Sequence, residues 1–437
     1  MKIALIHYHL RAGGVTRVIE SQARVLEGMG HEVFIPQGLP LLDYCRKTKA
    51  RAMDLLAEID YEILEKVDLW IIHNPVLGKN VLFPDLIEAL ARRGERLLLQ
   101  CHDFAEDGRP SNYEILRDRG NLYPLAEHVH YAFINERDRR LLIEAGVPEE
   151  RCHALPNALN PITIKPGESE GTLVFYPVRG IRRKNLGELC LWAAHAPKGV
   201  RFAIARAPEN LEWMAVHNDW RRFAEEMDLP IEFDVVDSPD DFKSWLERAS
   251  HIATTSVAEG FGLTFMEPHL INKPLIGRDL PDITADFKKQ GLSLGLTYEK
   301  ISVPLELLNQ NALRRDFAMS LEKTFLAYGK SPDVELAWEK FISKGEVDFG
   351  NLPEKHQREF IQKRHLPELH RWLIEALKTR KAQPQDISHW SLEAYQKRIS
   401  KVIQQISESE ISPVNHLDKE RVLKSFLHPD RFHFLRT

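Results

Sequence analysis

The stretch that decides the fold is residues 251–277, HIATTSVAEGFGLTFMEPHLINKPLIG. It predicts a short apolar strand, a turn that carries Gly260 and Gly262, a short helix and a second strand. Glycines in such a turn let the backbone approach a ligand closely, and the helix that follows offers unpaired N–H groups to phosphate oxygens. Glu259 stands in the turn and Glu267 about two turns along the helix, where both carboxylates can accept hydrogen bonds from hydroxyl groups. The segment therefore suits a ligand with phosphates in the middle and polyols at both ends, such as a nucleotide sugar.

Length and composition favour a globular protein of two domains. The chain has 437 residues, 43% hydrophobic and 28% charged, and a net charge of −5. A length of this order exceeds what one hydrophobic core normally supports, and the negative balance argues against a nucleic-acid partner. No apolar run is long enough to span a membrane, so membrane association is not favoured. The four cysteines show no metal-ligand spacing, which fits a reducing cytoplasm.

The first part of the chain predicts a Rossmann-like unit. Residues 2–8 are typical of a buried strand, the pair Gly13-Gly14 of a turn, residues from Val15 of a helix, and residues 31–36 of a second strand. Only one glycine pair is present, so the dinucleotide fingerprint is incomplete and a nicotinamide site is not expected. Further strands are predicted at 68–73, 96–101 and 130–135, with helices at 81–93 and 136–146; a basic cluster within 43–66 is predicted to lie on a solvated helix.

A proline-, glycine- and charge-rich segment at 161–171 predicts a linker, after which strand and helix alternate again. Strands are predicted at 172–178, 200–205, 231–236 and 251–255. The final helix, from Trp390, has Ile399, Val402 and Ile406 on one face.

The run from Glu259 to Glu267, EGFGLTFME, resembles the signature of glycosyltransferase family 4, retaining enzymes of the GT-B fold. Two further places match the family pattern. Arg179 and Lys184 follow the strand 172–178 at the family spacing, and His102 follows the strand 96–101. The chain departs from the pattern at Ala158, Asn160 and Ala205, where relatives carry glycine, aspartate and glycine. The resemblance covers about residues 1–345, with a weaker match near 390–406.

The resemblance implies an α/β architecture in which two Rossmann-like domains face a central cleft, with C-terminal helices crossing back to the first domain. The expected divisions are an acceptor-side domain at 1–160, the linker at 161–171, a nucleotide-sugar domain at 172–386 and returning helices at 387–437.

The resemblance also implies roles for individual residues. Fixed cations stabilise the departing diphosphate in place of a metal ion, so no metal site and no cofactor are expected. The implied catalytic residues are His102, Arg179, Lys184 and Glu259. The implied donor-binding residues are Gly14, Arg179, Lys184, Glu259, Gly260, Phe261, Gly262, Leu263 and Glu267. A polar loop after the strand 96–101 and the first glycine turn supply the predicted acceptor-binding residues, Arg11, Gly13, Asp103, Asp107, Arg109, Asn112 and Tyr113.

The expected reaction is transfer of a hexose, glucose or mannose, from UDP-glucose or GDP-mannose to a hydroxyl group with retention at the anomeric carbon. Arg109 and the polar loop favour a small polar acceptor that can be acidic, such as glycerate or a glycosylglycerate. The chain resembles a branch of the family that makes compatible-solute glycosides, such as glucosylglycerate or mannosylglucosylglycerate. A lipid or cell-envelope glycan acceptor, a nucleotide-sugar epimerase and a non-catalytic nucleotide-sugar binder remain alternatives. The sequence does not indicate an oligomeric state.

Overall fold

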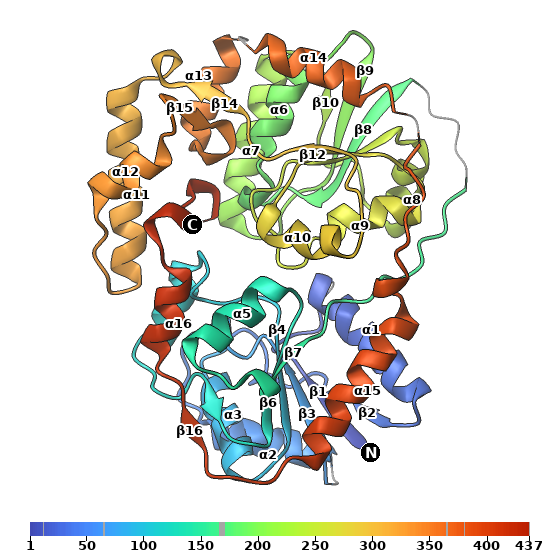
Figure 1. Ribbon diagram of the computed structural model, residues 1–437, viewed down its shortest axis with the longest axis vertical. Coiled ribbons are helices and arrows are strands. Elements are labelled where there is room, and N and C mark those ends of the chain that lie inside the picture. Colours follow the sequence, from blue (N-terminus) through green and yellow to red (C-terminus); the bar gives the residue numbers. More distant parts are fainter. Residues whose placement is uncertain (12, 64–65, 166–170, 364–365, 380, 437) are drawn as a thin grey trace. The chain divides into compact units, whose positions relative to one another are not determined.

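Two compact units make up the chain in the computed structural model (Figure 1). The structure describes all residues except 12, 64–65, 166–170, 364–365, 380 and 437. Part of the predicted linker and the last residue of the predicted C-terminal segment therefore lie outside the described residues. Unit 1 contains Met1–Asn160, Glu322–Pro332 and Ser388–Arg431; unit 2 contains Pro161–Leu321, Asp333–Ile387 and Phe432–Thr437.

Two short segments belong to a different unit from the one that the predicted domain boundaries gave them. Residues 322–332 belong to unit 1, where the Tyr328 hydroxyl donates a hydrogen bond to the Ala105 carbonyl at 3.0 Å and accepts one from the Arg109 amide at 2.7 Å. Residues 432–437 belong to unit 2, where the ring of Phe432 packs against that of Phe317. Both assignments depend on contacts between residues far apart in the sequence.

Unit 1 is built on a parallel six-stranded sheet in the order β2-β1-β3-β4-β6-β7. Its strands are β1 (Lys2–Ile6), β2 (Glu32–Phe34), β3 (Leu69–His73), β4 (Leu97–Cys101), β6 (Val129–Phe133) and β7 (Cys152–Ala154). A separate antiparallel pair joins β5 (Pro124–Leu125) to β16 (Asn415–His416). Its helices are α1 (Gly14–Gly28), α2 (Ala52–Ile63), α3 (Phe83–Arg92), α4 (Pro110–Leu116), α5 (Glu136–Ala145), α15 (Leu392–Glu408) and α16 (Lys419–Phe426).

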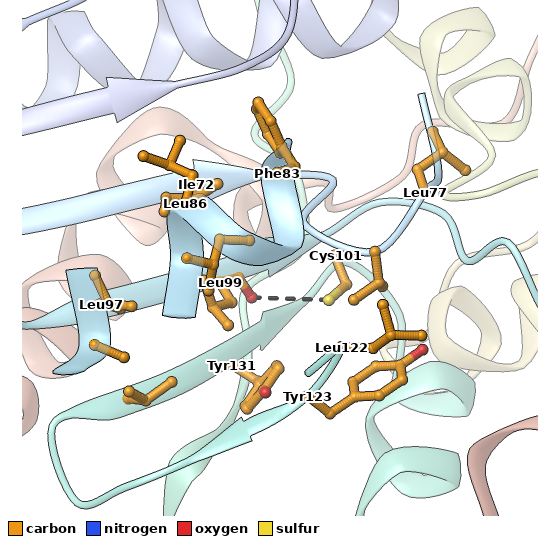
Figure 2. Packing of buried hydrophobic residues seen from close by; sticks show 14 of the residues in the cluster. Ile72, Leu77, Phe83, Leu86, Leu97, Leu99, Cys101, Leu122, Tyr123 and Tyr131 are labelled. Atoms are coloured by element: carbon orange, nitrogen blue, oxygen red, sulfur yellow. Dashed lines mark hydrogen bonds between the residues drawn. The ribbon is translucent and has the colours of Figure 1, made fainter. Parts of the chain in front are cut away.

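The central strands of unit 1 are apolar throughout because helices cover both faces of the sheet. On β3, Trp70 and Ile72 point into one hydrophobic cluster, and Leu69 and Ile71 into another. Figure 2 shows part of the first cluster, in which Ile72 and Leu99 lie among side chains from α3 and from the segment before β6.

The last long helix completes the second cluster of unit 1. Tyr395, Ile399, Val402 and Ile406 of α15 are buried in a cluster that also contains Ile19 and Leu26 of α1. The expected return of the C-terminal helices to the first domain is therefore confirmed. The shorter α16 buries its own apolar face in unit 1 through Val422, Leu423 and Phe426.

Unit 2 repeats the plan with a parallel sheet in the order β10-β9-β8-β11-β12-β13. Its strands are β8 (Thr172–Arg179), β9 (Val200–Arg206), β10 (Ile231–Glu232), β11 (His251–Thr254), β12 (Leu275–Arg278) and β13 (Leu296–Tyr298), with a separate antiparallel pair β14 (Ser302–Pro304) and β15 (Glu346–Asp348). Its helices are α6 (Leu186–Ala194), α7 (Leu211–Glu226), α8 (Pro239–Arg248), α9 (Leu263–Leu270), α10 (Pro281–Lys289), α12 (Val334–Phe341), α13 (Glu354–Lys363) and α14 (Pro367–Ala376). Helix α11 (Gln310–Ala327) begins in unit 2 and ends in residues of unit 1.

Two local predictions are wrong. The predicted strand 231–236 stops at Glu232, because Asp234 adopts a left-handed conformation with φ +59° that a strand does not allow. The basic cluster, Arg46 to Arg51, precedes α2 instead of lying on it. The carboxylate of Asp54 accepts a hydrogen bond from the Arg51 amide at 2.6 Å, which satisfies the start of the helix there. The predicted α/β class with two Rossmann-like domains is confirmed.

Candidate active site

A buried ion pair between Lys184 and Glu259 lies at the carboxyl edge of the unit 2 sheet. Lys184 lies in the turn after β8, and Glu259 lies in the loop between β11 and α9. Strands β8 and β11 are neighbours in the sheet, so their carboxyl ends lie side by side. Lys184 Nζ donates a hydrogen bond to Glu259 Oε1, and the two side chains are only 12% and 10% exposed.

Burial and charge act in opposite directions on this pair. Burial lowers the pKa of Lys184, and the Glu259 carboxylate opposes that effect. Burial alone raises the pKa of Glu259, but the charges of Lys184 and Arg183 and the hydrogen bond from Lys184 outweigh it, so the pKa of Glu259 is lowered. Because the carboxylate is stabilised in its charged form, Glu259 is ionised at neutral pH.

Hydrogen bonds hold the Lys184 turn and β8 to the residues that follow β11. The Thr255 hydroxyl donates to the Lys184 carbonyl at 2.9 Å, and the Tyr176 hydroxyl lies 2.7 Å from Ser256 Oγ. The Val257 amide donates to the Arg183 carbonyl at 3.0 Å. The ammonium group of Lys184 is therefore positioned by its own unit.

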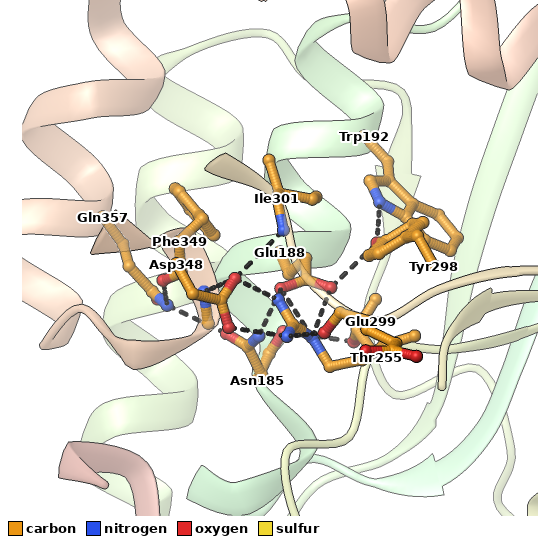
Figure 3. Close-up of polar contacts among 12 residues, drawn as sticks. Asn185, Glu188, Trp192, Thr255, Tyr298, Glu299, Ile301, Asp348, Phe349 and Gln357 are labelled. Carbon is orange, nitrogen blue, oxygen red and sulfur yellow. Dashed lines mark hydrogen bonds and ion pairs between the residues drawn. The ribbon is translucent and has the colours of Figure 1, made fainter. Parts of the chain in front are cut away.

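The residue after Lys184 is anchored in a buried polar network (Figure 3). Asn185 is left-handed with φ +51°, and its side chain donates to Glu188 at 2.8 Å and accepts from Gln357 at 3.0 Å. Arg278 lies between Glu188 and Asp348, at 2.5 and 2.7 Å. These charges are nearly or fully enclosed, so each needs its partners.

The glycine turn before α9 has the conformation that its sequence predicts. Gly262 precedes the helix with φ +88°, and a Cβ atom there would lie 2.9 Å from the Phe265 ring. The helix begins at Leu263, so Glu267 lies about one turn along it and not two as predicted. The charge of Glu267 acts on Lys184 in the same direction as that of Glu259, and raises its pKa.

Other predicted donor residues have different surroundings. Arg179 ends β8 and forms an ion pair with Glu209 at 3.0 Å, with its side chain 35% exposed. Phe261 is buried and packs edge-on against Phe287. The structure thus places Arg179, Lys184 and Glu259 at the carboxyl ends of neighbouring strands of unit 2, with Glu267 on the helix that follows.

In unit 1, three buried histidines mark the carboxyl edge of the sheet. His7 follows β1, His73 ends β3 and His102 follows β4. His73 Nδ1 lies 2.9 Å from His102 Nε2, and the two rings stack at 5.2 Å. Burial lowers the pKa of His102 to about 4 and that of His7 to about 3, so both rings are neutral at pH 7.

The glycine pair Gly13-Gly14 leaves room at the start of α1. Gly13 is extended, and no atom lies within 4 Å of where a Cβ of Gly14 would stand. The first turn of α1 has no side-chain cap. The backbone conformation therefore does not require glycine here, and the missing side chains leave space beside the helix N-terminus.

The predicted acceptor loop is linked to itself. Arg109 Nη2 donates to Asp103 at 2.5 Å, and Arg109 Nη1 donates to the carbonyls of Phe104 and Asp107, both at 3.1 Å. The carboxylate of Asp107 bonds to Arg137 at 2.9 Å. The guanidinium group predicted to bind an acceptor thus shapes its own loop.

The remaining predicted acceptor residues differ in exposure. Asn112 and Tyr113 are buried in unit 1, so they give an acceptor little surface to contact. Arg11 is exposed and pairs with Asp43 at 2.5 Å. The acceptor roles of these residues stay predictions.

Lys79 is a candidate that the sequence reasoning missed. Its ammonium lies 5.6 Å from the centroid of the Tyr44 ring, which Arg11 also faces at 5.5 Å. Burial lowers the pKa of Lys79, the charges of Arg46 and Arg109 lower it further, and the charge of Asp103 partly opposes them. No carboxylate within the described residues forms an ion pair with Lys79. A lysine directly after a glycine in the loop beyond a predicted strand was the only available signal.

In the part of the chain that the structure describes, His, Cys, Asp and Glu side chains form no group of three or more that could hold a metal ion. Each described helix is also too short or too polar to cross a membrane.

Comparison with known proteins assigns the class. No protein-family model matches the chain. The chain is 23% identical to a curated relative, mannosylglucosyl-3-phosphoglycerate synthase of Petrotoga mobilis, in an alignment that covers 99% of this chain and 98% of that protein. Among solved structures, a sucrose-phosphate synthase from Thermosynechococcus elongatus gives a TM-score of 0.54 at 13% identity, covering 93% of this chain and 99% of that one.

The Anabaena protein Alr3699/HepE, solved in complex with UDP and glucose, gives a TM-score of 0.52 at 14% identity, covering 92% of this chain and 99% of that one. The chain is a glycosyltransferase of the GT-B fold. The recognition made from EGFGLTFME is confirmed, and the relatives are consistent with glycosyltransferase family 4.

Proposed function

We propose that this glycosyltransferase moves a hexosyl group, with retention, from a nucleoside diphosphate sugar to a hydroxyl group of an anionic, glycerate-type acceptor. A phosphorylated glucosylglycerate is the favoured acceptor, because the full-length relative is a mannosylglucosyl-3-phosphoglycerate synthase. The observation that carries the donor half of the proposal is the buried Lys184–Glu259 ion pair at the carboxyl edge of the unit 2 sheet.

The donor side follows from charge. As the bond between the anomeric carbon and the diphosphate oxygen breaks, negative charge grows on the leaving group. Arg179 supplies positive charge at the end of β8, and Lys184 supplies it in the turn that follows this strand. Glu259 keeps the Lys184 ammonium ionised in its buried position, and Glu267 is proposed to accept hydrogen bonds from the ribose hydroxyls.

Retention requires the acceptor oxygen to attack from the face that the diphosphate leaves. We propose that the departing phosphate oxygen takes the proton of the acceptor hydroxyl while the new bond to the anomeric carbon forms. The products are then the glycoside and the nucleoside diphosphate, and no covalent enzyme intermediate forms. Isolation of a glycosyl-enzyme ester would overturn this step.

The acceptor side rests on Lys79. Lys79 is partly buried, forms no ion pair with a carboxylate within the described residues, and is repelled by Arg46 and Arg109, with only Asp103 acting in the opposite direction. Such an ammonium favours an added anion. Arg109 cannot fill this part easily, because its donors are taken by Asp103 and by loop carbonyls. The acceptor's phosphate or carboxylate is therefore proposed to bind beside Lys79.

The test is a matrix of UDP-glucose and GDP-mannose against glycerate, 3-phosphoglycerate and glucosyl-3-phosphoglycerate, with the products and their anomeric configuration read by NMR. Transfer with retention to a phosphorylated acceptor is expected. Lys184→Met should abolish most turnover, whereas Lys198→Met, at an exposed lysine of the same unit, should not. Conversion of the donor with no acceptor present would point to an epimerase, and an inverted product would contradict the proposed mechanism.

A further inference from the structure

A line of hydrogen bonds runs through the interior of unit 1 to His102. Gln22 of α1 donates through Nε2 to Gln100 Oε1 at 3.0 Å and to the Tyr395 hydroxyl at 2.8 Å. The other end of the same amide, Gln22 Oε1, lies 2.9 Å from His73 Nε2. His73 in turn contacts His102 at 2.9 Å. These residues come from α1, β3 and α15, with Gln100 in β4 and His102 directly after it, and all of them are buried.

The direction of each hydrogen bond follows from the chemistry of the groups. An amide oxygen only accepts, so His73 Nε2 carries a hydrogen and donates to Gln22. Burial holds the pKa of His73 far below its ordinary value, so the ring is neutral and its Nδ1 has a lone pair. His73 Nδ1 must then accept, and the donor at 2.9 Å is His102 Nε2–H.

We propose that Gln22 and His73 act as positioning residues that hold His102 in its Nε2–H form and so present an unprotonated Nδ1 to a substrate hydroxyl. That His102 Nδ1 meets the hexose or the acceptor rests on the proposed function. The protonation state itself depends only on unit 1. Nothing else in the described residues forms a hydrogen bond with His102 Nδ1. Stacking on His73 orients the ring of His102, and a hydrogen bond from the His102 backbone N–H to Asn74 at 3.2 Å holds its backbone.

His7 supports the same interpretation of this edge. Its Nδ1 lies 2.6 Å from the His9 carbonyl and must donate to it, which leaves His7 Nε2 as an acceptor. That nitrogen is buried and has no hydrogen-bond partner within the described residues. His7 follows β1 and His102 follows β4, one strand apart on either side of β3. Two acceptor nitrogens at one sheet edge suit a ligand rich in hydroxyl donors, a sugar or polyol, and do not suit a bare phosphate.

The experiment reads the ring directly. The full chain is labelled with ¹⁵N-histidine, and two-bond ¹H–¹⁵N correlation shows which nitrogen of each neutral ring carries hydrogen; His102→Gln assigns the His102 signals. We expect the Nε2–H form for His102 in the unmodified chain. An Nδ1–H form would overturn the proposal, and so would rapid exchange between both forms.

Two substitutions at His73 separate positioning from bulk. His73→Leu removes the hydrogen bonds that link Gln22 to His102, whereas His73→Gln can still donate to Gln22 and accept from His102. His73→Leu should lose the single His102 form and lower kcat about tenfold, the effect of roughly one hydrogen bond, with KM changed by less than about threefold. His73→Gln should restore both. A fall in kcat with the His102 form unchanged would assign His73 a merely structural role and overturn the proposal.

The chain offers a matched control. His130 and His153 form a second stacked pair, with nitrogens 2.8 Å and ring centroids 5.0 Å apart, but His130 lies near the start of β6. His153→Leu should leave kcat and the His102 spectrum unchanged. If His73→Leu does not fold by circular dichroism, Gln22→Leu provides the same test. If no nucleotide sugar is turned over, the proposed function fails while the NMR result still decides the form of His102.

Discussion

Replacing Lys184 by methionine keeps much of the side chain's length and removes its charge. The Glu259 carboxylate would then stay about nine-tenths enclosed without its ammonium partner. Removing one member of a buried ion pair costs about 3–5 kcal/mol of unfolding free energy. Because Arg183 still acts on Glu259 and both side chains keep slight exposure, we expect the lower end, about 3 kcal/mol. For a unit of about 200 residues this lowers Tm by roughly 6–12 °C.

The pH dependence has a definite sign. In the unmodified chain the pKa of Glu259 is lowered, so the stability it contributes is present at pH 7 and is lost as pH falls through that pKa. In Lys184→Met, burial without the ammonium favours the protonated carboxyl group. The folded variant then binds a proton more readily than the unfolded chain, which stabilises it as pH falls. The difference in Tm between the two proteins should therefore shrink from pH 7 to pH 5.

The assay is thermal unfolding by tryptophan fluorescence at both pH values. Lys198→Met controls for loss of an exposed lysine in the same unit. Adding Glu259→Gln to Lys184→Met should recover most of the lost stability, since no buried charge is then left alone. The reasoning is refuted if Lys184→Met has the same Tm as the unmodified chain at pH 7, or if the difference in Tm grows when the pH is lowered.

Three further predictions test the proposed donor site in unit 2 and the proposed anion site in unit 1. Glu267→Ala should raise the donor KM about tenfold by removing a hydroxyl acceptor, with the acceptor KM unchanged; equal effects on both would contradict a donor role. Lys79→Met should raise KM at least about tenfold for a phosphorylated acceptor and much less for its dephosphorylated form, measured side by side; no difference between the two acceptors would remove Lys79 from the anion site. Chelation with EDTA should leave transfer rates unchanged if Arg179 and Lys184 supply the positive charge at the donor site, as proposed; loss of activity that magnesium restores would contradict this.

The sequence predicted the elements that local pattern determines. The predicted strand at 68–73 is β3, Leu69–His73, because a strand covered on both faces is an unbroken apolar run. The sequence also placed Lys184 after the strand 172–178 and Glu259 after the strand 251–255, and the structure shows that these strands, β8 and β11, are parallel neighbours. The ion pair between them was not predicted, because spacing alone gives no side-chain direction.

Other features depend on contacts that no local pattern contains. The Arg109 guanidinium was predicted to face a ligand, yet the loop folds back so that Asp103 and carbonyl oxygens take its donors. Tyr328 joins unit 1 through Arg109 and Ala105, more than 200 positions away. Lys79 becomes a candidate only once its burial and its lack of an ion-pair partner among the described residues are known. In each case the availability of the side chain depends on its burial and its tertiary contacts, which the sequence alone does not give.

The buried network beside Lys184 explains how a turn can serve as a rigid cation site. Asn185 takes a left-handed conformation that favours glycine or asparagine, and its amide is held between Glu188 and Gln357. Arg278 neutralises Glu188 from the other side, at 2.5 Å. Since these charges are satisfied by one another before any ligand arrives, the Lys184 ammonium would need little reorganisation in its proposed role of stabilising a leaving diphosphate. The position of the Lys184 ammonium is therefore set by unit 2 itself, with contributions from β8, α6 and β12, and under the proposed function donor binding has only to place the diphosphate against it.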